Sequence, residues 1–196
     1  MTAQPVLVVE HEAQCPPGWV GDWLAEAGRE LDVRRPYLGD ELPADLTEHR
    51  SLVVLGGSMD AYADADFPWL TRVKSLVRGA VGDATPTLGI CLGHQLIAVA
   101  LGGEVHPNPN GQQIGVLPVG WLPAAHEDGL FSTLTAAEGA VQWNNDVVTR
   151  LPAEAVALAQ TPAGEVQAAR FASMMWGVQW HPETGPEIAA TWADDD

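Results

Sequence analysis

Cys91 lies in a segment whose composition favours a reactive cysteine. A short apolar stretch, Thr87 to Ile90, runs into Gly89-Ile90-Cys91-Leu92-Gly93, and a helical pattern follows. Glycines beside a nucleophile allow the tight strand-to-helix turn of a nucleophile elbow, here with sulfur in place of a serine oxygen. The free N–H groups and positive dipole end of the following helix favour the thiolate, which is the reactive form. Taken alone, the residue also fits a buried structural cysteine.

A base and a group to orient it occur near the other end of the chain. His181 follows an apolar stretch in the run Trp176 to Glu183. Residues two apart in extended backbone point to the same side, so the Glu183 carboxylate can approach the His181 ring. Pro182 restricts the backbone between them, and the second ring nitrogen stays free to face a sulfur. The pattern predicts a triad with Cys91 for nucleophilic catalysis, and the alternative for His181 alone is a surface residue.

Cys91 and His181 can meet only if the strands before them end at the same edge of a sheet. Apolar runs at 5–9, 31–35, 51–55 and 87–90 alternate with helical patterns at 19–27, 69–81 and 92–101. This alternation predicts an α/β fold with a mostly parallel central sheet flanked by helices. Ligands bind at the carboxyl ends of strands in such sheets, where Cys91 and the turn Gly56-Gly57 are expected.

The pattern changes after residue 103. Short, turn-bounded runs follow at 104–106, 114–121, 140–143, 155–160, 166–171 and 175–180. They predict antiparallel strands in the C-terminal half, added to the edge or face of the sheet.

Length and charge limit the classes of function. At 196 residues the chain fits one domain, 1–196, that is large enough to bury a core. Its net charge of −17 argues against nucleic acid or an anionic membrane as partner. Lys74 is the only lysine and no phosphate-binding glycine loop is present, so any ATP chemistry is expected on another polypeptide. No cofactor is expected.

Cysteine usage and the chain's apolar runs bear on metal binding and location. Cys15 and Cys91 predict neither a disulfide framework nor a metal site. The first residues lack the features of a signal peptide, and no apolar run is long enough to span a bilayer. A reducing cytoplasm is therefore the expected location, and it suits a reactive thiol.

Two motifs carry a resemblance to a known family. Gly-Ile-Cys-Leu-Gly-His-Gln around Cys91, with Gly-Val-Gln-Trp-His-Pro-Glu around His181, resembles the class I, triad-type glutamine amidotransferases. Leu55 to Tyr62, with Phe67 to Leu70 after it, is similar to the stand-alone branch related to the glutaminase domain of GMP synthase. The resemblance covers nearly the whole chain and implies the flavodoxin-like sheet of that family.

The resemblance also implies a role for each residue of the triad. Cys91 is the nucleophile, His181 the general acid and base, and Glu183 the group that orients the histidine. Backbone N–H groups of Gly57 and Leu92 are implied to hold the oxyanion. The residues implied to bind substrate are Gln95, Gly56, Ser58, Gln113 and Asn144.

Three departures from the family pattern stand out. Family members often carry proline where Ser58 stands, and commonly histidine where Asn144 stands. The tail after Glu183 is short, so the last helix of many relatives is expected to be missing or confined to Glu187–Trp192.

The implied reaction is hydrolysis of the glutamine side-chain amide through a cysteinyl γ-glutamyl thioester. The ammonia would pass to an acceptor on a separate ATP-dependent synthetase. One alternative is a γ-glutamyl hydrolase or cysteine peptidase of the same fold that acts on another γ-glutamyl amide. A second alternative is a catalytically silent regulatory or binding protein.

Overall fold

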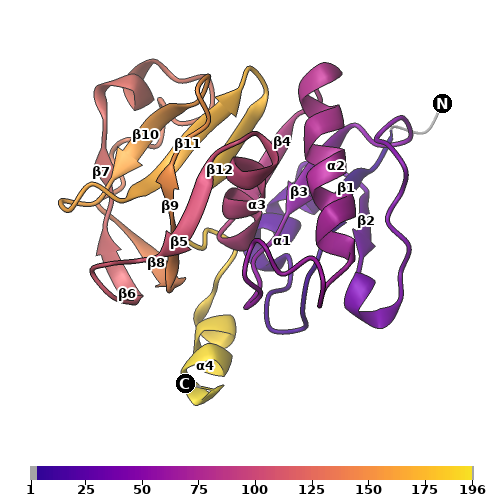
Figure 1. The fold of residues 1–196 in the computed structure, drawn as a ribbon, viewed down its shortest axis with the longest axis horizontal. Helices are drawn as coiled ribbons and strands as arrows, with labels where there is room; N and C mark the ends of the chain where they lie inside the picture. Colours follow the sequence, from indigo (N-terminus) through magenta and orange to yellow (C-terminus); the bar gives the residue numbers. More distant parts are fainter. Residues whose placement is uncertain (1–3, 196) are drawn as a thin grey trace.

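A central sheet of eight strands runs through the protein in its computed structural model, which describes residues 4–195 (Figure 1). The strand order is β2-β1-β3-β4-β12-β11-β10-β7. The parallel strands are β1 (Val6–Val9), β2 (Leu31–Arg34), β3 (Ser51–Val54), β4 (Thr87–Ile90) and β12 (Met175–Val178). The antiparallel strands are β11 (Val166–Ala172), β10 (Val156–Gln160) and β7 (Gly120–Trp121). The predicted fold class, a mostly parallel sheet with antiparallel additions, is confirmed.

Helices α1 (Gly18–Glu26), α2 (Trp69–Gly82) and α3 (Leu92–Ala100) cover the two faces of this sheet. The chain also forms a C-terminal helix, α4 (Pro186–Asp195), and short 3-10 turns, η1 (Pro36–Leu38) and η2 (Pro123–Glu127). Leu7 and Val9 of β1 belong to one buried cluster with α2 and α3, whereas Val8 belongs to another with Val20 of α1. Strand side chains alternate between faces, so these helices lie on opposite faces of the sheet. Burying each such side chain stabilises the fold by about 1.5–3 kcal/mol.

Two small sheets complete the C-terminal half. β5 (Glu104–Pro107) pairs with β9 (Asp146–Arg150), and β6 (Gln113–Pro118) pairs with β8 (Gly139–Asn144). Strand β9 has no counterpart among the predicted runs. The β6–β8 pairing places Gln113 directly opposite Asn144, which brings two of the predicted site residues together.

The prediction that 175–180 is an added antiparallel strand is wrong in one respect. β12 pairs antiparallel with β11 but parallel with β4, so it lies inside the sheet beside the strand that leads to Cys91. Gly177 lies opposite Gly89 across this pairing. A Cβ on Gly177 would come within 2.6 Å of the His94 ring, and one on Gly89 within 2.6 Å of Gly93 backbone. The paired glycines therefore let α3 lie close against the two strands that lead into the site.

The C-terminal helix also differs from expectation. α4 extends from Pro186 to Asp195, beyond the expected 187–192, and lies below the sheet in Figure 1. Its indole at Trp192 is 8% exposed and packs against His181. The short tail after Glu183 thus supplies a side chain to the site.

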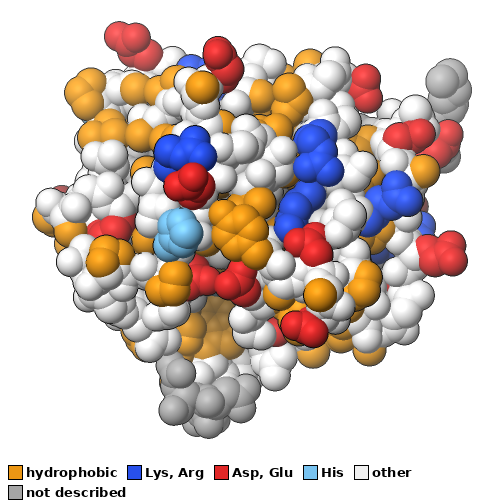
Figure 2. All heavy atoms as spheres, viewed as in Figure 1, with side chains coloured by type: hydrophobic (Ala, Val, Ile, Leu, Met, Phe, Trp, Pro, Cys, Tyr) orange, Lys and Arg blue, Asp and Glu red, His pale blue; other side chains and the backbone are white. Residues whose placement is uncertain are grey.

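Charged side chains of both signs lie on the face of the molecule shown in Figure 2. Figure 2 shows red carboxylate groups spread over the visible face, with blue Lys and Arg side chains in small groups among them.

In the part of the chain that the structure describes, no helix has the length and apolar character needed to cross a membrane.

Candidate active site

Cys91 occupies the tight turn between β4 and α3. Its backbone has φ +49° and ψ −106°, and Cys91 and Ala84 are the only non-glycine residues of the described chain with positive φ. Such backbone strain persists only where the surroundings enforce it. A Cβ on Gly93 would lie 2.0 Å from the Val54 carbonyl oxygen, so only glycine fits there. The Cys91 N–H donates to the Val178 carbonyl at 2.8 Å, which ties the turn to β12.

His181 and Glu183 form a buried pair just after β12. The His181 Nδ1 and Glu183 Oε1 atoms are 2.7 Å apart, and the two residues are 4% and 1% exposed. The His181 backbone N–H donates to the Val141 carbonyl, and the Glu183 carbonyl accepts from the Trp19 N–H. These bonds hold the segment at both ends. The Nε2 atom of His181 is buried without a hydrogen-bond partner among the described residues.

The surroundings of His181 favour its protonated form. Burial alone would lower the pKa of the imidazole, but the Cys91 sulfur and the Glu183 carboxylate together raise the pKa well above its ordinary value. Negative charge near a cation favours the charged state. The imidazolium is therefore available to give a proton from Nε2.

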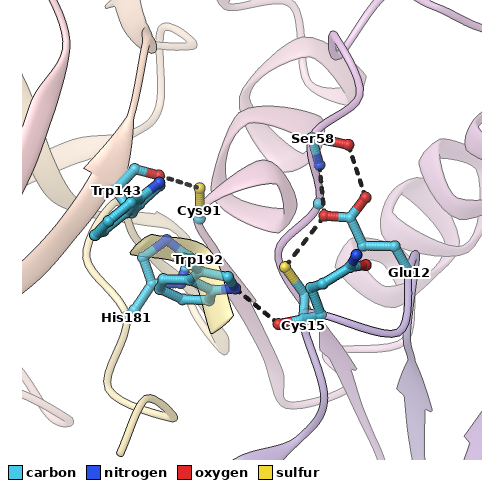
Figure 3. A pocket seen from close by; sticks show the side chains of 9 residues that line it. Glu12, Cys15, Ser58, Cys91, Trp143, His181 and Trp192 are labelled. Carbon is cyan, nitrogen blue, oxygen red and sulfur yellow. Dashed lines mark hydrogen bonds between the residues drawn. The ribbon is translucent and has the colours of Figure 1, made fainter. Parts of the chain in front are cut away.

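One cavity of about 270 Å³ brings the sequence motifs together. It is lined by Glu12, Gln14, Cys15, Gly57, Ser58, Cys91, Trp143, His181 and Trp192. Figure 3 shows these side chains converging from the β1–α1 loop, the Gly56-Gly57 turn, the elbow, β8 and α4. Cys91, His181, Gly57 and Ser58 are thus brought together as predicted from the sequence, with Glu183 behind His181.

Glycines allow the close approach of the two reactive groups. A Cβ on Gly56 would lie 3.3 Å from His181 Cε1 and 3.7 Å from Cys91 Cβ, so both side chains border one small space. A Cβ on Gly57 would lie 3.0 Å from the Leu92 side chain. Leu92 is the first residue of α3, and the first N–H groups of a helix have no partner within it. Gly57 and Leu92, the two residues predicted to supply the oxyanion donors, therefore lie next to each other.

Glu12 binds the turn that carries Gly57. Its carboxylate accepts from the Ser58 N–H at 3.0 Å and from the Ser58 hydroxyl at 2.7 Å. The Cys15 thiol also donates to it, at 3.4 Å. Burial, together with the Glu12 charge, raises the pKa of Cys15, so this second thiol stays protonated. A proline in place of Ser58 could not donate the N–H bond, which gives a physical meaning to this departure from the family pattern.

The other predicted substrate residues lie beside the cavity rather than along its lining. Gln95 is buried, and its amide donates to the Asp146 carbonyl at 3.0 Å and to Gln179 Oε1 at 3.3 Å. The Asn144 amide donates to Gln113 Oε1 at 3.2 Å. Their role in substrate binding stays a prediction.

Several residues at the site, Glu12 and Gln14 of the cavity lining among them, had no role in the sequence interpretation, and three of these lie close to Cys91 or His181. The Gln179 amide lies 3.5 Å from Cys91 Sγ, and the Trp143 carbonyl lies 4.0 Å from the same sulfur. Trp192 is the third. Gln179 belongs to the motif before His181, and that position is the only sequence signal that could have drawn attention to it. Across residues 4–195, no group of three or more His, Cys, Asp or Glu side chains could hold a metal ion.

Comparison with known proteins agrees with this geometry. The glutamine amidotransferase class-I family matches residues 20–191 of the chain. One subunit of a glutamine-hydrolysing GMP synthase from Methanosarcina barkeri is 38% identical over 164 residues, covering 82% of this chain and 79% of that relative. Gamma-glutamyl peptidase 5 from Arabidopsis thaliana is 29% identical over 169 residues, covering 84% of this chain and 66% of that protein. The chain thus spans slightly less than two thirds of the length of this peptidase.

Solved structures give the same result. The crystal structure of a glutamine amidotransferase from Thermotoga maritima superimposes with a TM-score of 0.88 at 27% sequence identity. The match covers 98% of this chain and 82% of that one. With its flavodoxin-like sheet, this chain belongs to the class I glutamine amidotransferase family.

Proposed function

We propose that this protein hydrolyses the side-chain amide of glutamine through a cysteinyl γ-glutamyl thioester and releases ammonia. The observation that carries the proposal is the position of Cys91 and His181 in one cavity, after the adjacent strands β4 and β12. Glu183 binds the far nitrogen of His181 at 2.7 Å, so the near nitrogen faces the cavity. Nucleophile, base and orienting group are the three parts that such catalysis needs.

In the first half of the reaction, the Cys91 sulfur attacks the amide carbon and a C–S bond forms. The carbonyl oxygen becomes an oxyanion that accepts from the N–H groups of Gly57 and Leu92. One such donor lowers the barrier by about 3 kcal/mol. The protonated His181 then gives its proton to the amide nitrogen, the C–N bond breaks, and ammonia leaves.

In the second half, the thioester is hydrolysed. Neutral His181 takes a proton from water, and the resulting hydroxide attacks the thioester carbon. The C–S bond breaks, the sulfur leaves as the thiolate, and glutamate is released. Glu183 stabilises the imidazolium each time it forms, without taking up the proton itself.

The acceptor of the ammonia is proposed to belong to another polypeptide, in the cytoplasm. The similarity to one subunit of a GMP synthase supports a separate synthetase as partner. A reducing compartment would keep the Cys91 thiol available. Both cysteines of the chain are free in the structure.

A second candidate function is hydrolysis of another γ-glutamyl amide by the same triad. The similarity to a γ-glutamyl peptidase from Arabidopsis thaliana favours it. The two functions differ only in the amine that leaves. Turnover of glutamine, γ-glutamyl peptides and γ-glutamylamines by the same preparation would separate them.

The test is glutamate formation by the wild-type protein and by Cys91→Ala, with and without a candidate synthetase. We expect the substitution to lower turnover by about 10⁴-fold or more, because it removes the nucleophile. Incubation with substrate should also add a γ-glutamyl group to Cys91, seen by mass spectrometry. Unchanged turnover in Cys91→Ala would disprove the triad. Failure of an electrophilic glutamine analogue to label Cys91 would support a silent binding protein instead.

A further inference from the structure

Trp192 is held firmly at the edge of the catalytic cavity. Its ring centroid lies 4.6 Å from that of His181, at an interplanar angle of 61°, and 5.8 Å from that of Trp143. The indole N–H donates to the Gln14 carbonyl at 2.8 Å. Figure 3 shows the indole between the His181 ring and the loop that carries Cys15. Trp192 thus bridges α4, the β1–α1 loop and β8.

The position of His181 determines where the leaving amine must lie. A general acid has to come within hydrogen-bond reach of the atom that it protonates. Nδ1 is occupied by Glu183, so the proton comes from Nε2, which is buried at the cavity. Any substituent on the leaving nitrogen therefore extends into the space beside the His181 ring. Trp143 and Trp192 form the aromatic walls of that space.

We propose that Trp192 is a specificity-determining residue that limits the size of the amine released by the site. The inference rests on the proposed hydrolysis by the triad, and it specifies which γ-glutamyl amides the site accepts. The cavity has a volume of about 270 Å³, and Trp192 borders it beside the His181 ring. It suits γ-glutamyl compounds whose leaving group is ammonia or a small amine. A larger amine would have to displace an indole that is fixed by a hydrogen bond and by two aromatic neighbours.

The test compares kcat/KM for glutamine and for γ-glutamylbenzylamide, which differ only in the leaving amine. In Trp192→Ala, we expect the ratio of benzylamide to glutamine turnover to rise by at least about tenfold over the wild-type ratio. Trp192→Leu serves as a second variant that keeps an apolar side chain and should raise the ratio by less. Trp23→Ala is the matched control, because Trp23 is 53% exposed on α1 and does not line the catalytic cavity. Its ratio should stay at the wild-type value.

The ratio of benzylamide to glutamine turnover distinguishes a role of Trp192 in specificity from a role in stabilising the fold. If Trp192 only stabilised α4, turnover of both substrates would fall together and the ratio would stay unchanged in both Trp192 variants, which would overturn the proposal. Failure of the proposed function would look different. In that case wild-type protein would hydrolyse neither substrate above the level of Cys91→Ala.

Discussion

The two sides of the catalytic cavity are constructed differently, although Cys91 and His181 follow neighbouring strands. On the Cys91 side, position is set by the backbone. Gly93 lies against the Val54 carbonyl, Gly56 leaves room beside the Cβ of Cys91, and the Cys91 N–H is bound to β12. Few side chains are needed there, and none of these contacts can be moved by a change of rotamer.

On the His181 side, position is set by side chains from distant segments. Glu183 binds the ring nitrogen, and Trp192 packs on the ring from the C-terminal helix. Trp143, from β8, borders the same space. The nucleophile is thus fixed by steric contacts of the backbone, whereas the position of the acid and the space for the leaving group can be changed by single side-chain substitutions. Substitutions on the His181 side should therefore lower activity, whereas substitutions in the backbone on the Cys91 side should lower stability.

Among substitutions of the residues that position Cys91 and His181, the largest loss of turnover is expected on the His181 side. Glu183→Gln keeps the size of the side chain but removes the charge that orients the ring and stabilises the imidazolium. We expect turnover of glutamine to fall by about 10³–10⁴-fold, as for the orienting carboxylate of other triads. The free energy of unfolding, measured by urea titration, should change much less than activity does. A Glu183→Gln protein with nearly full turnover would contradict the assignment.

On the Cys91 side, we expect a substitution to lower the stability of the fold. Gly93→Ala places a methyl group 2.0 Å from the Val54 carbonyl oxygen, so strand and helix must separate. We expect the free energy of unfolding to fall by about 3 kcal/mol, at the upper end for overpacking. Gly79→Ala is the control, because Gly79 is an exposed residue within α2 with no atom near a new Cβ. That change should stabilise the protein by up to about 1 kcal/mol. Equal effects of the two substitutions would refute the steric argument.

The pH dependence should report on His181. Its pKa is raised from 6.5 to about 10, so the protonated acid is lost as pH rises through that value. Its contribution to stability follows the same sign: it is fully present below pH 6.5 and is lost as pH rises through about 10. We expect kcat/KM for glutamine to fall on the alkaline side, and Glu183→Gln to move that limb to lower pH. The measurement is a rate profile with protein integrity checked at each pH. An alkaline limb in the same place in both proteins would argue against His181 as its origin.

The difference between the two sides also explains how much could be predicted from the sequence. The elbow is a local pattern, so the boundaries of β4 and α3 and the position of Cys91 follow from a few adjacent residues. The His181–Glu183 pair is equally local. Trp192 is distant in sequence from Gln14 and Trp143, and nothing in its own surroundings indicates these contacts.

Strand direction and burial were harder to infer for the same reason. A short apolar run does not reveal its neighbour, so the parallel pairing of β12 with β4 could not be inferred from 175–180 alone. Strand β9 was missed because only Val147 and Val148 are apolar within it. Gln95 was implied to bind substrate, but its side chain is buried and its amide donates to the Asp146 carbonyl and to Gln179, partners that are distant in the sequence.

The smallest effect on activity is expected for Glu12, a side chain that supports the turn on the Cys91 side of the cavity. Glu12→Gln weakens the two bonds that hold Ser58, next to the proposed oxyanion donor Gly57. Hydrogen bonds to a charged group contribute about 1.5–3 kcal/mol each, but Glu12 is partly exposed and glutamine keeps one acceptor, so we expect a loss of less than about tenfold in kcat/KM. Ser58→Ala keeps the backbone N–H bond and should cost less than Glu12→Gln. Glu26→Gln, on the exposed side of α1, removes the same charge away from the cavity and should leave turnover unchanged. If Glu12→Gln and Glu26→Gln lowered turnover equally, the effect would come from net charge, and Glu12 would have no part in holding the turn.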